Sequence, residues 1–332
     1  MQRRGFLQFL VGGSATIATS RLAAAQGGPE VRRIGLLSVG APVTPDAAAG
    51  AGPPLFRALA RHGYVVDRNF RLDSRGAAGR AERLPQLVDE LMADRVEVIV
   101  TFGFPAALAA KERAATIPVV VMGAGDPVAT ALVDSLARPG GHVTGVTEVS
   151  TDLAAKRLQL LKETVPTIQR VAVLWNADDL GMTLRYRAAE VAGQTLGVAI
   201  TPLGVRAPDD FAGAFSAMTR APPDAILMVT DVLTRLNRQR VYEYAAAHRL
   251  PAIYEDDSFA RDGGLMAYGP DRDEVLERVA GLVDRILKGA KPATLPLEEP
   301  TRFRFAINLK TAAALGLAIP ESILARADEV IE

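Results

Sequence analysis

The sequence predicts an α/β protein with two Rossmann-like lobes that are joined by a hinge and hold a ligand cleft between them. Short β-branched runs alternate with helical runs along the chain, as in an open, doubly wound sheet with right-handed crossovers. Continuous apolar runs such as VIV and VVV fit parallel strands that are covered on both faces. The alternation stops in the glycine-rich stretch at residues 136–150 and then restarts, which indicates a second lobe.

The elements of the first lobe follow from these patterns. Strands are expected within residues 31–40, 96–105 and 117–127, and helices within 54–64, 80–95 and 106–115. In the second of these helices, apolar residues recur at the spacing of one helical face: Leu84, Leu87, Val88 and Leu91. A long helix after residue 270 has a similar stripe, formed by Val275, Val279, Leu282 and Ile286. We expect this helix to return to the first lobe, with Asp271 as its N-cap and Glu274 as the reciprocal partner.

The second lobe repeats the alternation. Helices are expected within residues 152–166, 184–197, 208–221 and 238–249, and strands within 170–176, 198–205, 224–231 and 250–256. The chain is expected to pass between the lobes near residues 143–149 and again at 263–270. The predicted boundaries are 30–146 plus 269–292 for the first lobe and 147–268 for the second, while the lobe of the C-terminal crossing segment, 293–332, stays open.

Residues 1–25 have the pattern of a secretory signal peptide, with a charged start, an apolar and small-residue middle, and an A-x-A end. The adjacent Arg3 and Arg4 are typical of the twin-arginine export signature. The apolar run is too short and too rich in Gly, Ser and Thr for a membrane anchor, which needs about 20 apolar residues. We expect cleavage near Ala25 and a soluble protein in the periplasm.

The composition argues against several classes of protein. Removing the signal leaves 35 basic and 38 acidic residues, a net charge of −3, so nothing favours a nucleic-acid partner. The absence of cysteine excludes disulfides, iron–sulfur clusters and a lipid anchor on a thiol. The three histidines lie far apart in the sequence, and no nucleotide-binding loop or hydrolase motif occurs. We therefore expect no catalytic residues, no metal and no cofactor.

The candidate ligand-binding residues are those at the expected strand ends, because ligands of doubly wound sheets bind beyond the carboxyl ends of the strands. The first lobe supplies Ser38, Gly103, Phe104, Gly125 and Asp126, and the second lobe with its joining strand supplies Asn176, Thr230, Asp231, Glu255 and Tyr268.

Two of these positions suggest how a ligand is held. Gly103 lies at a strand-to-helix turn, where backbone N–H groups and the helix dipole favour a carboxylate. Asp231 is the first choice for an ammonium group, with Asp126 and Glu255 behind it. The alternatives stay open, because Gly103 and Gly125 also fit ordinary turns. Asp126 and Asp231 also fit helix caps. Trp175 is expected in the core rather than in the cleft.

Several stretches resemble the family of ABC transporter substrate-binding proteins that includes receptors for tryptophan and related aromatic amino acids. They are RRIGLLS at 32–38, the run at 96–147, RVAVLWN at 170–176, GGLMAYGPD at 263–271 and the closing run at 305–331. The resemblance implies the two-lobed type I periplasmic-binding fold and delivery of a small solute to an inner-membrane permease. This chain lacks the cysteine that anchors many relatives as lipoproteins, and its first cleft loop, residues 38–52, is long and rich in Ala and Pro.

The sequence thus predicts a periplasmic solute receptor of an ABC transporter, a monomer that closes on a small carboxylate-bearing solute, either an amino acid or an aromatic acid. Two alternatives remain. One is an exported enzyme of the same architecture that uses Asp126, Asp231 or Glu255 as acid or base. The other is a sensor subunit that presents its ligand to a membrane kinase.

Overall fold

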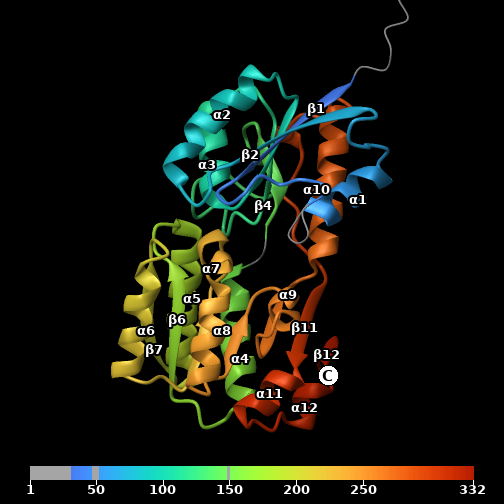
Figure 1. Cartoon of the computed structure of the whole chain (residues 1–332). Helices are drawn as coiled ribbons and strands as arrows, with labels where there is room; N and C mark the ends of the chain where they lie inside the picture. Colours follow the sequence, from blue (N-terminus) through green and yellow to red (C-terminus); the bar gives the residue numbers. More distant parts are fainter. Residues whose placement is uncertain (1–30, 47–51, 148–149) are drawn as a thin grey trace, which may run out of the picture. The chain divides into compact units, whose positions relative to one another are not determined.

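The computed structural model describes residues 31–46, 52–147 and 150–332. These residues belong to one compact unit. The expected signal peptide at residues 1–25 and part of the first cleft loop lie outside the described residues. The remaining chain forms two β-sheets, each with helices on both faces (Figure 1). The predicted α/β class with two lobes is confirmed.

The first sheet has five parallel strands in the order β2-β1-β3-β4-β5. They are β1 (Arg32–Ser38), β2 (Phe70–Gly76), β3 (Val98–Phe102), β4 (Val119–Met122) and β5 (Val143–Val146). The apolar stretches of β3 and β4 lie in the middle of the sheet and are buried on both faces, as parallel packing requires. Sequence reasoning missed β2, because this edge strand alternates apolar residues with charged ones such as Arg71 and Asp73.

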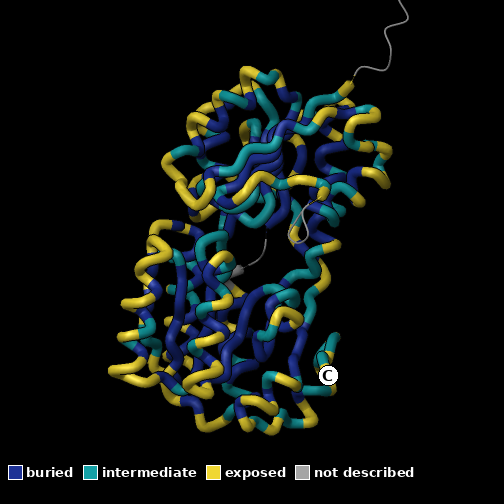
Figure 2. The backbone as a smooth tube through the Cα atoms, viewed as in Figure 1, coloured by how far each residue is buried: buried dark blue, intermediate teal, exposed yellow. Residues whose placement is uncertain are grey.

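Two pairs of helices cover the first sheet. One face packs against α1 (Gly52–Arg61) and α10 (Arg272–Leu287), and the other against α2 (Leu84–Ala93) and α3 (Phe104–Arg113), with the short η1 (Ala81–Arg83) before α2. The stripes predicted for α2 and α10 are buried in these two layers. Figure 2 shows the central strands mainly in dark blue, as buried, and the outer sides of the helices in yellow, as exposed.

The second sheet has seven strands in the order β12-β11-β10-β9-β8-β6-β7. They are β6 (Arg170–Asn176), β7 (Ala199–Val205), β8 (Ala225–Met228), β9 (Ala252–Tyr254), β10 (Met266–Pro270), β11 (Phe303–Asn308) and β12 (Glu329–Ile331). All neighbours are parallel except β10 and β11, which run antiparallel. The C-terminal segment therefore ends as two strands of this sheet.

The helices of the second sheet also form two layers. On one face lie α4 (Ser150–Thr164), α5 (Leu180–Leu196), α11 (Leu309–Leu315) and α12 (Glu321–Leu324). On the other face lie α6 (Asp210–Arg220), α8 (Arg238–Ala247) and α9 (Asp257–Arg261), while α7 (Val232–Leu236) follows the end of β8. Trp175 is buried in the first of these layers and stacks on Tyr186 at 3.9 Å between ring centroids, so the core position expected for it is confirmed.

The segment that follows α10 is tied to both sheets. It contains η2 (Pro292–Thr294), forms a bridge between Val146 and Glu298 beside β5, and then enters β11. Asp271 caps α10 as expected, accepting a hydrogen bond from the backbone N–H of Glu274. The prediction that the Glu274 side chain is the reciprocal partner of this cap is wrong. Its carboxylate instead accepts from the backbone of Thr301 and Arg302, because the returning segment lies against the first turn of α10.

None of the helices in the described ranges combines the length and the apolar character that a membrane crossing requires.

Candidate functional site

A cavity of about 820 Å³ is lined by the carboxyl ends of strands from both sheets. The first sheet contributes the loop after β1, the Phe102–Gly103 turn after β3 and the Met122–Gly123 turn after β4. The second sheet contributes the loops that follow β6, β8 and β9. This is where the topology of doubly wound sheets places a ligand.

Six of the ten residues singled out from the sequence line this cavity, namely Ser38, Gly103, Asn176, Thr230, Asp231 and Glu255. The other four, Phe104, Gly125, Asp126 and Tyr268, are not among the lining residues. Phe104 is buried at the start of α3, and Tyr268 stacks on Phe303 beside the core. The Asp126 carboxylate accepts hydrogen bonds from the backbone of Val128 and Ala129 in its own loop.

The turn after β3 is built around Gly103. Its φ of 84° is a left-handed conformation that glycine adopts without strain, and α3 begins at the next residue. The N–H of Gly103 itself donates to the carbonyl of Met122, so it is already occupied. The first-turn N–H groups of Phe104 and Ala106 have no intrahelical acceptor, and Pro105 has no N–H at all. The anion-binding capacity of this turn therefore comes from α3 rather than from Gly103.

Asp231 is both a helix cap and a cavity residue. One carboxylate oxygen accepts from the backbone N–H of Thr234 at 2.8 Å, and the Thr234 hydroxyl accepts from the N–H of Asp231, which completes a capping box on α7. The other oxygen accepts from the side-chain amide of Asn176 at 2.6 Å. This pair joins the ends of the neighbouring strands β6 and β8.

Glu255 lies between two buried arginines. Its two oxygens accept from Arg157 at 2.7 Å and from Arg185 at 2.6 Å, and the three side chains are 7%, 2% and 1% exposed. Arg157 also donates to the carbonyl of Tyr268 at 2.7 Å. The group, which we call the Glu255 triad, lies on the cavity lining. Both oxygens of Glu255 are thus engaged by guanidinium groups.

A second cluster of the same composition forms at the end of β9. Asp256 caps α9 through Ser258 and pairs with Arg235 at 3.1 Å and with Arg272 at 3.2 Å. Burial acts to raise the pKa of Asp256, but the charges of Arg235 and Arg272 outweigh it and hold that pKa at about 2. The guanidinium of Arg235 also lies 4.7 Å from the ring centre of Phe259. Because Arg272 begins α10, this cluster connects α10 to the second sheet.

Asp179 is a cavity residue that sequence reasoning did not select. It is 3% exposed and caps α5 by accepting from the backbone N–H of Met182 at 3.2 Å. Burial, followed by the negative charge of Asp231, raises its pKa to about 6. The available sequence signal was its place three residues after the predicted strand 170–176. The helix was expected only within residues 184–197, whereas α5 begins at Leu180, directly after Asp179.

Two further features of the site concern charge and metals. The remaining charged residues on the cavity lining include Arg80, Glu82 and the exposed pair of Arg206 with Asp178. Across the described ranges, no three His, Asp or Glu side chains are placed to hold a metal ion together.

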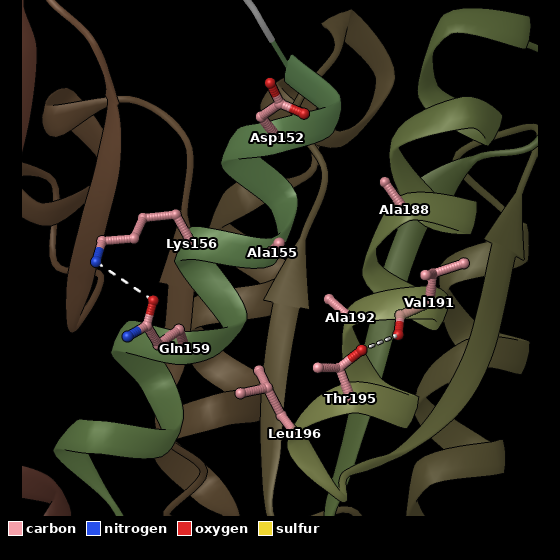
Figure 3. A pocket seen from close by; sticks show the side chains of 9 residues that line it. All are labelled: Asp152, Ala155, Lys156, Gln159, Ala188, Val191, Ala192, Thr195 and Leu196. Carbon is pink, nitrogen blue, oxygen red and sulfur yellow. Dashed lines mark hydrogen bonds between the residues drawn. The ribbon is translucent and has the colours of Figure 1, made fainter.

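A second hollow, of about 610 Å³, lies on the outer side of the second lobe between α4 and α5 (Figure 3). Its lining includes the small side chains of Ala155, Ala188 and Ala192, and Lys156 donates to Gln159 at 3.3 Å beside them. This hollow lacks the convergent polar groups of the larger cavity, which makes the larger cavity the candidate site.

The chain is similar to known proteins in sequence and in fold. Residues 37–331 match the model of a family described as ABC transporter substrate binding protein. A tyrosine-binding protein of Clostridioides difficile is 23% identical over 262 residues, which cover 79% of this chain and 75% of the relative.

Two solved structures have a similar fold. A conserved domain protein from Vibrio cholerae superimposes with a TM-score of 0.84 at 23% identity, covering 91% of this chain and 100% of that one. An ABC domain in complex with L-Trp from Streptococcus pneumoniae gives a TM-score of 0.82 at 24% identity, with the same coverage.

Proposed function

Because the chain belongs to the family of ABC transporter substrate-binding proteins, we propose that it is a receptor that binds a small carboxylate-bearing solute and delivers it to an inner-membrane permease. The observation that carries the proposal is the cavity, which is lined from the strand ends of both sheets by charged and backbone groups. The solute classes that fit are amino acids and aromatic acids. The relatives that bind tyrosine and L-Trp support this choice.

The proposed binding mode places opposite ends of the solute on opposite lobes. The carboxylate is received at the start of α3, beside Gly103, where the first-turn N–H groups lie at the positive end of a helix. An amine, where the solute has one, is received by Asp231. Glu255 is a weaker candidate than its position in the sequence suggested, since both of its oxygens already accept from arginines.

We further propose that the two lobes close around the solute. The lobes correspond to residues 30–146 plus 269–292 and residues 147–268, with β11 and β12 of the C-terminal segment supplementing the second sheet. Glycines lie where the lobes approach each other: a Cβ added at Gly125 would lie 3.1 Å from the Cα of Gly181, and one at Gly40 would lie 3.0 Å from Val232. Because glycine has no Cβ, the loops of the two lobes can come close together at these positions over a bound ligand.

The place of action follows from the signal pattern at residues 1–25, which supports export of a folded monomer to the periplasm. Replacing Arg3 and Arg4 with lysine should retain the protein in the cytoplasm if the twin-arginine route is used. Unchanged periplasmic yield would exclude that route while leaving secretion itself intact.

The experiment that tests the function is a thermal-shift screen of the purified protein against amino acids, aromatic acids and other carboxylates, followed by titration calorimetry. A ligand that binds only the folded state adds about 2.7 kcal/mol to the free energy of unfolding at a concentration of about a hundred times its Kd, and this raises the melting temperature. Small-angle scattering of the saturated protein should then show compaction. A screen in which no carboxylate-bearing solute binds would refute the proposal.

A further inference from the structure

We propose that Asp179 and Asp231 together form the subsite for a ligand ammonium group, and that a bound ammonium takes the place of a proton held at Asp179. The inference rests on the proposed function, because it concerns the same cavity. It narrows the solute class to compounds with a cationic nitrogen, and so to an amino acid rather than a simple aromatic acid.

The fold brings the two carboxylates to one place. Asp179 follows β6 and caps α5, while Asp231 follows β8 and caps α7. Since β6 and β8 are neighbouring parallel strands, their carboxyl ends open at the same edge of the sheet. Both aspartates line the cavity, and they lie close enough to each other for the charge of Asp231 to act on Asp179.

The two aspartates differ from three other carboxylates of the lining in what they contact. Glu255 pairs with Arg157 and Arg185, Asp256 pairs with Arg235 and Arg272, and Asp178 pairs with Arg206. Asp179 and Asp231 instead accept hydrogen bonds from backbone N–H groups and from the amide of Asn176, and Asp179 is faced by the charges of Asp231 and Arg185. A cation that enters the cavity at this point meets two carboxylates, whereas an anion meets like charge.

A separate observation fits the same ligand group. The hydroxyl of Thr230, on the cavity wall next to Asp231, is buried and has no hydrogen-bond partner among the described residues. A primary ammonium has three donors and no acceptor. The two carboxylates and this hydroxyl supply three acceptors for it.

The proton linkage follows from the environment of Asp179. Burial and the charge of Asp231 raise the pKa of Asp179 to about 6, so the empty site takes up a proton near that pH. An ammonium group interacts favourably only with the ionised carboxylate and must displace the proton. Affinity for an amino acid should therefore rise with pH up to about 6 to 7 and then level off.

The test uses titration calorimetry with L-tyrosine and L-tryptophan and with their deaminated analogues, 3-(4-hydroxyphenyl)propionate and indole-3-propionate. For the wild-type protein we expect the amino acids to bind about tenfold more tightly at about pH 7 than at about pH 5. Measurements in buffers of different ionisation enthalpy should show net proton release near pH 6. The deaminated acids should bind more weakly than the amino acids at neutral pH.

Asparagine variants separate charge from capping, because asparagine is as good an N-cap as aspartate. We expect Asp179→Asn to weaken amino-acid binding by about one to two decades at neutral pH, since a hydrogen bond to a charged group contributes about 1.5–3 kcal/mol. The pH dependence should disappear, and affinity for the deaminated acids should not fall. Asp231→Asn should weaken the amino acids similarly. Asp271→Asn, which changes the equivalent cap of α10 at a residue that does not itself line the cavity, is the matched control and should bind like the wild type.

Three results would overturn the inference. If the deaminated acids bind as tightly as the amino acids, the ammonium subsite is wrong while the carboxylate receptor stands. If Asp179→Asn keeps the full pH dependence, the proton is held elsewhere. If neither class of compound binds the wild-type protein, the proposed function fails and this inference fails with it.

Discussion

Replacing Glu255 with glutamine should destabilise the protein more than almost any other single charge removal. Arg157 and Arg185 are at most 2% exposed, and both donate to this one carboxylate at 2.7 Å or less. A neutral amide cannot balance either guanidinium, and its NH₂ group presents donors to a donor. Removing one partner of a buried ion pair typically costs about 3–5 kcal/mol, because an uncompensated charge stays in the interior.

The measurement is urea and thermal unfolding of the ligand-free protein. For a chain of this size we expect the melting temperature to fall by about 5–10 °C. The control is Asp89→Asn, which breaks the Asp89–Arg113 pair, in which both side chains are about half exposed. Surface pairs of this kind contribute about 0–1 kcal/mol, so this variant should melt close to the wild type.

The result also decides between two roles for Glu255. If Glu255→Gln unfolds at the same urea concentration as Asp89→Asn, the buried-triad argument is refuted. If it remains stable but loses affinity for amino acids only, Glu255 receives the ligand amine and the structural role assigned to it is wrong. Loss of stability without selective loss of amino-acid binding is the outcome that the contacts predict.

Three further predictions follow from individual contacts. Asp179→Asn should stabilise the ligand-free protein by about 1–3 kcal/mol above pH 6, and this gain should vanish as the pH falls towards 3.8. The reason is that burial and the charge of Asp231 raise the pKa of Asp179 from 3.8 to about 6 in the folded state, so that ionised Asp179 destabilises the fold. Glu274→Gln should do the reverse. Burial acts to raise the pKa of Glu274, but hydrogen bonds from Thr301, Arg278 and Arg302 outweigh it and hold that pKa at about 2 rather than 4.5. In urea titrations at several pH values, the wild type should therefore be favoured by about 1–3 kcal/mol at neutral pH and lose this advantage as the pH falls below about 4.5. Gly181→Ala should weaken ligand binding severalfold in calorimetry, since its Cβ would lie 3.2 Å from Asp179 and 3.4 Å from the carbonyl of Ala124, whereas Gly213→Ala, with nothing within 4 Å, should not.

The lobes and most of their elements were predictable because hydrophobic periodicity reports burial directly. The stripe of α10 and the apolar runs of β3 and β4 are buried as predicted, since burial removes those side chains from water. The edge strand β2 was missed for the opposite reason. Its paired backbone and its ion pairs, such as Arg33 with Asp73, hold it in the sheet without an apolar pattern.

The candidate site was predictable only where it lies at strand ends. Topology places Asn176, Thr230, Asp231 and Glu255 at the carboxyl ends of strands, and all four line the cavity. The arginines were missed because they lie on helices, away from those ends. Arg157 is three residues after Ala154 and four before Leu161 on the apolar stripe of α4, and Arg185 lies between Met182 and Ala189 on that of α5. A charged residue within a buried stripe was the available signal, but its partner at Glu255 is 98 residues away from Arg157 and is identified only by the fold.

Capping and ligand binding were treated as alternatives at Asp231, but a cap does not by itself exclude ligand binding. A carboxylate has two oxygens and about four acceptor positions, whereas a helix cap uses one or two of them. At Asp231 the cap occupies one oxygen, and the other faces Asn176 on the cavity wall. Asp179 is likewise a cap that lines the cavity. Because each cap begins a helix at a strand end, the residue that starts the helix is also the one that the topology presents to a ligand. A variant that tests binding at these positions must therefore preserve the cap, which asparagine does and alanine does not.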